Sequence, residues 1–194
     1  MNITNEILKN AIENSKNKLI KLSEDIEKIT FPDSAEIEFS TNKLNDKYIA
    51  DILTSAPAGY AQKFEDTDFI YIFSIVEPID TLNAKIYSAL CESREIQSSD
   101  EFEGKKDFCR PNNQSSNYLY VGRSQKLRSR LKQHLDAGND GVFAMHMLRW
   151  VAGINVKIKI SYYQFDGLDN LTVQALEDAL WESFNPMFGK KGDK

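Results

Sequence analysis

The chain has 194 residues, of which 41% are hydrophobic, and its formal net charge is −5. This length indicates one ordinary domain, or one domain with an extension. The sequence contains no apolar run of the roughly 18 residues that a membrane helix needs. Its first residues lack the basic start and the apolar stretch of a signal peptide, so we expect a cytoplasmic protein without a membrane partner. The two cysteines are too few for a disulfide framework. The two cysteines and two histidines also lack the close spacing of a structural zinc site, which argues against structural zinc.

Apolar residues recur at helical spacing through residues 3–29 and predict a long amphipathic helix, which Pro32 ends. A strand at 36–40 and a helix at 45–54 are expected to follow, so that residues 1–66 form a mostly helical N-terminal extension. Heptad-like spacing in the first helix permits a homodimer, and packing within one chain explains the same pattern. The residues with this spacing are Leu8, Ile12, Leu19, Leu22, Ile26 and Ile29.

Strands and helices are expected to alternate in the rest of the chain. β-Branched and aromatic residues, or alternating polarity, predict strands at 68–76, 118–122 and 156–165. Helical periodicity predicts helices at 80–93, 124–135, 143–152 and 171–184, and we expect Asn170 to cap the last of these. The polar stretch 96–117 predicts a loop. In the second strand, Tyr118 and Tyr120 are expected to point to the same face.

Positive charge is concentrated around the helix predicted at 124–135, although the chain as a whole is acidic. Residues 104–134 contain eight lysines and arginines, with Asp107 as their one acidic residue. The field near a site steers a polyanion more than the total charge does, so this segment is a candidate surface for nucleic acid. The residues expected to bind it are Arg123, Lys126, Arg128 and Lys132.

Two residues of this helix carry the chemistry that a phosphate requires. Arg130 and His134 are four residues apart and lie on one ridge, beside the apolar ridge of the same helix. The planar guanidinium of arginine donates two parallel hydrogen bonds to phosphate, and histidine transfers protons near neutral pH. An ordinary solvated helix face is the alternative. Glu177, flanked by apolar residues on the last helix, is either a functional carboxylate or a boundary residue that reaches water.

The order and spacing of these residues resemble the GIY-YIG nuclease superfamily. Phe-Ile-Tyr at 69–71 stands for the GIY motif, with Phe69 in place of its glycine, and Tyr-Val-Gly at 120–122 stands for YIG. The resemblance covers about residues 67–189. Because 48 residues separate the two motif tyrosines, we expect a helix and loop to be inserted at about 77–117. The site residues that the resemblance implies are Tyr71, Tyr120, Arg130, His134 and Glu177.

The resemblance implies an α+β, sandwich-like fold for residues 67–192, with a small three-stranded antiparallel sheet flanked by helices. It implies hydrolysis of phosphodiester bonds in DNA with Mg²⁺ or Mn²⁺, and it leaves RNA open as a substrate. Glu177 would bind the metal and Arg130 would stabilise charge on the phosphate. Tyr71 and Tyr120 would position and activate water, and His134 would assist. Asn185, beside Pro186, would either support the site or cap the preceding helix.

Three functions remain open from the sequence. The first is an active metal-dependent DNA endonuclease, which the complete set of five site residues favours. The second is a nucleic-acid-binding module that has the same fold without turnover. The third is a partner-binding protein assembled through its N-terminal helix. The sequence has neither the glycine-rich Walker motif of nucleotide hydrolases nor the nucleophile elbow of serine hydrolases.

Overall fold

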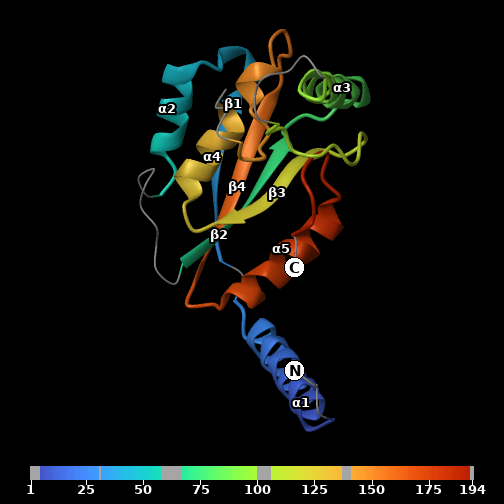
Figure 1. Ribbon diagram of the computed structural model, residues 1–194. Coiled ribbons are helices and arrows are strands. Elements are labelled where there is room, and N and C mark those ends of the chain that lie inside the picture. Colours follow the sequence, from blue (N-terminus) through green and yellow to red (C-terminus); the bar gives the residue numbers. More distant parts are fainter. Residues whose placement is uncertain (1–4, 31, 58–66, 100–105, 137–140, 193–194) are drawn as a thin grey trace.

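The computed structural model describes residues 5–30, 32–57, 67–99, 106–136 and 141–192. Within these residues, four antiparallel strands form one sheet in the order β1-β4-β2-β3 (Figure 1). The strands are β1 (Ser34–Ser40), β2 (Thr67–Ile75), β3 (Tyr118–Ser124) and β4 (Lys157–Asp166). The helices are α1 (Asn5–Glu27), α2 (Asp46–Thr54), α3 (Asp80–Ile96), α4 (Leu127–Leu135) and α5 (Asn170–Phe184), with short 3-10 turns at Thr41–Lys43 and Met147–Arg149. The α+β class is thus confirmed.

The prediction of three strands is wrong, because the segment around residues 34–40 joins the same sheet as the motif strands. It pairs with β4 over its whole length, from Ser34 opposite Tyr163 to Ser40 opposite Lys157. Ile37 and Phe39 are buried on one face of β1, while Glu36 and Glu38 between and before them are exposed. This alternation suits an edge strand with one covered face. The first 66 residues therefore contribute a strand to the sheet, in addition to their helices.

The two faces of the sheet are covered by different helices. On one face, Phe69, Tyr71 and Phe73 of β2 join the large core, to which α2, α3 and α4 also contribute. On the other face, Ile70 packs with Phe165 and with Val173 of α5. Because side chains alternate along a strand, β2 serves both cores and is almost entirely buried. The candidate site residues of β2, β3 and α4 lie on the first face.

The prediction of a helix at 143–152 is wrong, because the regular structure in this segment is a short 3-10 turn at Met147–Arg149. The backbone of Ala144 bonds to another segment: its N–H donates to Asp107 O (2.9 Å) and its carbonyl accepts from Cys109 N (2.9 Å). His146 adopts the left-handed conformation, with φ 46°. Apolar residues at helical spacing here line a core without forming a helix. The cap of α5 is also one residue earlier than predicted, because the Asp169 side chain accepts the first backbone N–H groups.

A bulge separates the two tyrosines of β3. The ladder between β2 and β3 shifts after Phe73, which is opposite Tyr120, so that Ser74 is opposite Tyr118. The extra residue turns Tyr118 to the α5 side, where its ring lies 4.3 Å from that of Phe184. The expectation that Tyr118 and Tyr120 share a face is therefore wrong, because it assumed a regular strand.

Helix α1 projects away from the sheet and from the other helices (Figure 1). None of its residues is buried. Large aliphatic side chains remain exposed along its length: Ile7, Leu8, Ile12, Leu19, Ile20 and Ile26. The chain rejoins the core at Ile29, which packs against the cluster around Ile70. Among the described residues, no helix combines the length and apolarity that crossing a membrane requires.

Candidate active site

Gly122 allows the two motif tyrosines to come together. It lies opposite Tyr71 in the β2–β3 ladder, and the rings of Tyr71 and Tyr120 stack across it with centroids 6.2 Å apart and planes 6° apart. A Cβ atom at Gly122 would lie 2.6 Å from the Tyr71 hydroxyl and 2.7 Å from Tyr120 Cε1. Any other residue would therefore displace both rings. The glycine of the Tyr-Val-Gly motif is needed for this close approach.

A second glycine packs against the other edge of Tyr120. Gly189 has φ +100°, and a Cβ atom there would lie 2.8 Å from Tyr120 Cε2. The segment that carries it runs along β3, because Met187 N donates to Tyr118 O (2.7 Å) and Phe188 N donates to Leu119 O (2.9 Å). Sequence reasoning missed this role of Gly189. The signal was a glycine three residues after Pro186, close to the end of the last predicted helix.

Arg130 joins the two tyrosines. Its Nε donates to the Tyr71 hydroxyl (3.2 Å) and its Nη2 donates to the Tyr120 hydroxyl (3.3 Å). Its Nη1 donates to Gln133 (2.9 Å), and its Nη2 also reaches the carbonyl of Phe143 (3.0 Å). The apolar ridge of α4 is fully buried, which fixes the helix against the sheet. The guanidinium is thus oriented before any ligand binds.

His134 completes this cluster from the next turn of α4. Its Nε2 lies 3.1 Å from the Tyr71 hydroxyl, and its Nδ1 accepts the backbone N–H of Met145 (3.3 Å). A neutral His134 therefore carries its proton on Nε2 and donates it to Tyr71. Burial lowers the pKa of His134 well below its usual value, and the charge of Arg130 lowers it further. The imidazole is neutral at physiological pH and acts as a hydrogen-bond donor.

The two tyrosines are protonated at neutral pH in this environment. Burial raises the pKa of Tyr71 far above its usual value, and the charge of Arg130 opposes that shift. Burial likewise raises the pKa of Tyr120, again against the effect of Arg130. The Tyr71 oxygen accepts hydrogen bonds from both Arg130 and His134. These donors favour the phenolate, and a further cation nearby would lower the pKa more.

Glu177 approaches the cluster from α5 without a hydrogen bond to it. Its carboxylate is near enough for its charge to raise the pKa of both Tyr71 and Tyr120. Its Oε2 lies 3.3 Å from Arg123 Nε and accepts a hydrogen bond from Gln174 (3.2 Å). Burial raises the pKa of Glu177 itself, although Arg123 opposes the shift. The negative charge of this carboxylate is therefore only partly compensated.

One carboxylate of this kind fits a hard divalent cation. Mg²⁺ keeps several waters and needs only one or two protein carboxylates. Both contacts of Glu177 fall on Oε2, and no hydrogen bond to its Oε1 occurs in the described residues. The described part of the chain has no group of three or more histidines, cysteines and acidic residues that would enclose a metal ion. Such an ion would rely on Glu177, water and a substrate phosphate.

A polar groove of about 470 Å³ lies beside this cluster. Three cations line it, namely Arg123, Lys126 and Arg130. Hydroxyl and amide groups complete the lining, from Ser124, Gln125, Ser129, Gln133 and Asn170. Asp68 also lines the groove, where its carboxylate lies 3.8 Å from Arg123. The lining is therefore suited to an anion, since it offers three cations and neutral hydrogen-bond donors, and its one carboxylate is close to Arg123.

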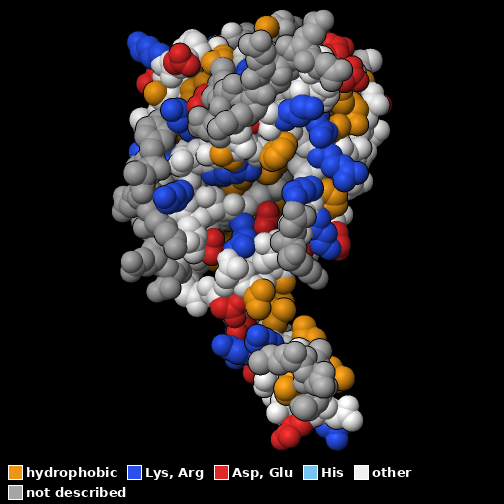
Figure 2. Space-filling view, viewed as in Figure 1, with side chains coloured by type: hydrophobic (Ala, Val, Ile, Leu, Met, Phe, Trp, Pro, Cys, Tyr) orange, Lys and Arg blue, Asp and Glu red, His pale blue; other side chains and the backbone are white. Residues whose placement is uncertain are grey.

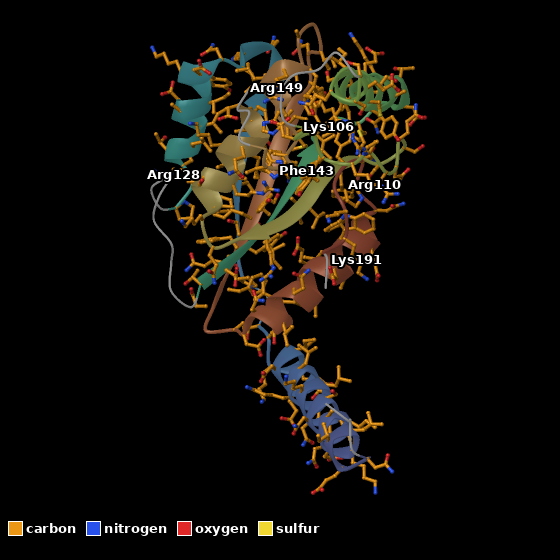
Figure 3. All side chains as sticks on the ribbon, viewed as in Figure 1. Lys106, Arg110, Arg128, Phe143, Arg149 and Lys191 are labelled. Carbon is orange, nitrogen blue, oxygen red and sulfur yellow. The ribbon has the colours of Figure 1, made fainter. Side chains whose placement is uncertain are left out.

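The four basic residues predicted to bind nucleic acid have different surroundings. Arg123 contacts Glu177 and donates to Asn170 (2.7 Å), so it belongs to the site rather than to the outer surface. Lys126 is exposed at the groove, and Lys132 is exposed with Asp136 at 3.8 Å. Arg128, which Figure 3 labels, donates to backbone carbonyls at the end of α2. Arg128 thus has a structural role, and its contact with nucleic acid stays a prediction.

Asn185 is the C-cap of α5. Its backbone adopts the left-handed conformation with φ 42°, and its N–H donates to Trp181 O (2.9 Å). Its side chain belongs to an exposed residue. The structure shows the cap, and a supporting role of Asn185 in the site stays a prediction.

Sequence reasoning missed the polar residues that orient the site. Gln133 accepts from Arg130, and Gln174 contacts Glu177 and Arg123. Both are three residues from the side chain that they orient, a spacing that places them on the same helix face. That spacing was the available signal. Comparison of the chain with protein-family models, curated proteins and solved structures gives no significant match, so the resemblance to GIY-YIG nucleases stays a prediction.

Proposed function

We propose that the protein is a metal-dependent endonuclease that hydrolyses phosphodiester bonds in DNA at a single site of the GIY-YIG type. The observation that carries this proposal is the convergence of Arg130 on the hydroxyls of Tyr71 and Tyr120, with His134 donating to the same Tyr71 oxygen. This cluster borders a groove lined by cations. Burying the hydroxyls of two stacked tyrosines and a guanidinium costs free energy of folding. An arrangement that served packing alone would use apolar side chains.

The side chains divide the work on the phosphodiester. Arg130 donates to the phosphate and offsets the negative charge that develops there during displacement. Tyr71 orients the attacking water. To accept a proton from this water, Tyr71 must first lose its own; the donors Arg130 and His134 favour the phenolate, and the charge of a bound metal ion would favour it further. Tyr120 holds the stacked geometry and adds a second hydroxyl. Glu177 would hold Mg²⁺ or Mn²⁺, which supplies further charge stabilisation at the phosphate.

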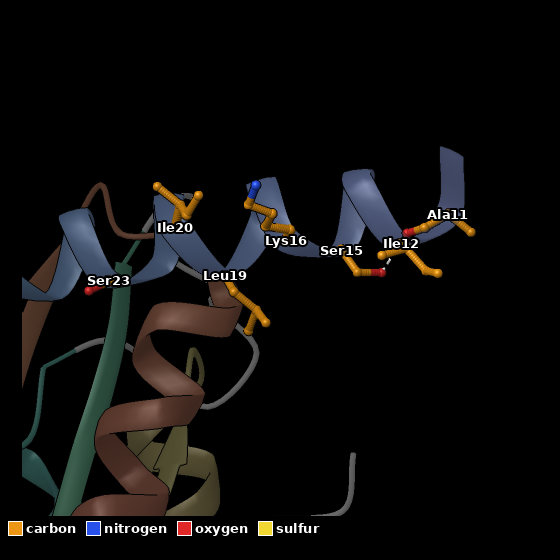
Figure 4. Close-up of a pocket in the computed structure, with 7 residues that line it drawn as sticks. All are labelled: Ala11, Ile12, Ser15, Lys16, Leu19, Ile20 and Ser23. Carbon is orange, nitrogen blue, oxygen red and sulfur yellow. Dashed lines mark hydrogen bonds between the residues drawn. The ribbon is translucent and has the colours of Figure 1, made fainter. Parts of the chain in front are cut away.

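Helix α1 supports the proposal that the enzyme is a homodimer. Its apolar residues follow a 4-3 spacing, in which Ile12, Leu19 and Ile26 take position a of a heptad. In the same register Leu8 and Leu22 take position d, with Ser15 at the d position between them. β-Branched residues at a with leucine at d favour two helices in a parallel coiled coil, and this stripe follows that pattern except at Leu19 and Ser15. In Figure 4, Ile12 and Leu19 project from the same face of α1. Two copies would cut both strands of a duplex from one assembly.

The ion pair between Arg123 and Glu177 favours a second candidate function. Arg123 Nε lies 3.3 Å from the carboxylate that would bind the metal, and a guanidinium there competes with a cation. On this second proposal the protein binds nucleic acid and has no turnover, and the cluster serves as a phosphate clamp.

Cleavage of supercoiled plasmid with Mg²⁺ or Mn²⁺ tests the two candidates. The native protein is compared with Glu177→Ala and Arg130→Ala, and with Glu182→Ala as a control on the exposed face of the same helix. Metal-dependent nicking that the first two substitutions abolish and the third preserves would support the nuclease. A folded native protein that binds plasmid, branched DNA or RNA without cutting any of them would exclude the nuclease and support the nucleic-acid-binding module.

A further inference from the structure

Phe143 exposes an aromatic ring next to the candidate active site. The residue is 58% exposed. The other strongly exposed large hydrophobic residues in the described part of the chain are isoleucines and leucines, most of them on α1. An exposed phenylalanine ring contributes no buried apolar surface to the core. Phe143 is not on α1, so the interface expected along that helix does not account for its exposure. Its position calls for a ligand with an apolar, planar face.

The backbone that carries this ring is fixed to the site. The carbonyl of Phe143 accepts from Arg130 Nη2 (3.0 Å), and the N–H of Met145 donates to His134 (3.3 Å). Between them, the backbone of Ala144 makes two hydrogen bonds to the segment 107–109. The ring is thus presented by a held backbone, at a set distance from the guanidinium that would bind the phosphate.

Basic side chains lie on the same face of the molecule as this ring. Figure 3 labels Lys106 and Arg110 on this face with Phe143, and the space-filling view from the same direction shows basic side chains around an apolar centre (Figure 2). Arg128 and Lys191, which Figure 3 also labels, contact carbonyls at the end of α2 and Glu182, respectively. Lys106 and Arg110 are exposed. They come from the segment inserted between the two motif strands. A polyanion that followed these cations to Arg130 would pass over Phe143.

We propose that Phe143 is a base-stacking residue, and that the DNA substrate carries an unpaired nucleotide beside the phosphate held by Arg130. Inside a duplex, both faces of each base are covered by its neighbours, so an aromatic side chain reaches a base face only where the base is unpaired or flipped out. A flap, a branch or a single strand provides such a base directly. This inference rests on the proposed function and specifies its substrate.

The test is binding of fluorescein-labelled DNA in the absence of metal, so that cleavage does not interfere. A single strand, a blunt duplex and a duplex with a single-stranded flap are compared for the native protein, Phe143→Ala, Phe143→Leu and Phe143→Trp. Ile96→Ala serves as the control, since Ile96 is 66% exposed on α3. Base stacking on one aromatic ring predicts about a tenfold loss of affinity for the single strand and the flap in Phe143→Ala.

The pattern across variants distinguishes stacking from other roles. Phe143→Trp should retain affinity, Phe143→Leu should lose most of it, and affinity for the duplex should stay unchanged throughout. A 2-aminopurine base placed at the junction should be quenched by the native protein and by Phe143→Trp, and not by Phe143→Ala. Equal affinity of Phe143→Ala and native protein for every DNA would overturn the inference, as would an equal loss on duplex and single strand.

Failure of the inference and failure of the proposed function give different results. If metal-dependent cleavage is lost in Arg130→Ala and unchanged in the Phe143 variants, the proposed nuclease is supported and the stacking role of Phe143 is excluded. Binding that depends on Phe143 in a protein that never cleaves would retain the stacking role on a binding module. No affinity of the native protein for any of these DNAs would remove both.

Discussion

The Nε2 atom of His134 lies 3.1 Å from the hydroxyl oxygen of Tyr71, and both side chains are buried. Because the backbone N–H of Met145 occupies Nδ1, the imidazole is held as a donor and cannot serve as a base while this bond persists. The proposed assistance by His134 therefore consists of stabilising charge on Tyr71. This relation between the two residues has consequences for stability as well as for catalysis.

The first prediction concerns pH. Burial lowers the pKa of His134 and of His146 below the usual value in the folded chain, so the unfolded chain binds protons more readily. The free energy of unfolding should be largest above about pH 6.5, the ordinary pKa of histidine. It should fall as the pH drops below that value, by at most about 1.4 kcal/mol per pH unit for each histidine that takes up a proton on unfolding.

Urea denaturation at about pH 7.5 and about pH 5.5 measures this dependence. His134→Gln cannot bind the proton and should show a shallower loss of stability with acid than the native chain. His146→Gln is the matched comparison, because it removes the other buried histidine and leaves Tyr71 untouched. Native stability that is flat across this interval would contradict the buried neutral imidazoles.

Gly122 gives the second prediction. Its replacement by alanine places a Cβ atom 2.6 Å from the Tyr71 hydroxyl and 2.7 Å from Tyr120, so the stacked rings must separate. We expect the substitution to cost about 1–3 kcal/mol of stability and to abolish the activity proposed for the site. Gly167→Ala is the control, because Gly167 has φ +70° and a Cβ atom there would meet nothing within 4 Å. It should lose stability through backbone strain while keeping full activity.

The third prediction separates Arg128 from Lys126. Arg128 donates to Ala56 O (3.1 Å) and Thr54 O (3.3 Å) at the end of α2, whereas Lys126 is exposed at the groove. Arg128→Ala should lower the urea midpoint and leave DNA affinity unchanged. Lys126→Ala should keep the midpoint, weaken DNA binding, and reduce the slope of log affinity against log salt by about 1. The reverse outcome would show that Arg128 is the phosphate contact.

The sequence predicted the strands and helices that carry the site, because their periodicities are strong and local. The five expected site residues lie on two strands and two helices, and four of them form one hydrogen-bonded cluster, whereas Glu177 acts on the two tyrosines only through its charge. Periodicity could not show that 34–40 pairs with β4, since pairing partners are far apart in the sequence. It also could not show the bulge that turns Tyr118 away, because a bulge leaves no signature in alternating polarity.

The segment 143–152 was misassigned for a similar reason. Its buried residues occur at helical spacing, but the backbone of Ala144 makes its hydrogen bonds with residues 107 and 109. Whether this backbone bonds within a helix or to a distant segment depends on the tertiary fold. Arg128 illustrates the same limit for side chains. A basic residue on a basic helix is expected to face a polyanion. No local pattern encodes the hydrogen bonds that its guanidinium donates to backbone carbonyls at the end of α2.

The fourth prediction concerns assembly through α1. Leu19 is 66% exposed in the middle of the 4-3 stripe, so Leu19→Glu should place a charge in the seam of the proposed coiled coil and prevent it. Asn17→Glu adds the same charge outside that stripe and should leave assembly unchanged. Light scattering after gel filtration should give the native protein and Asn17→Glu twice the mass of one chain, and Leu19→Glu the mass of one chain. A native protein of single mass at every concentration would rule out the dimer, and α1 would then need a different partner to cover its apolar face.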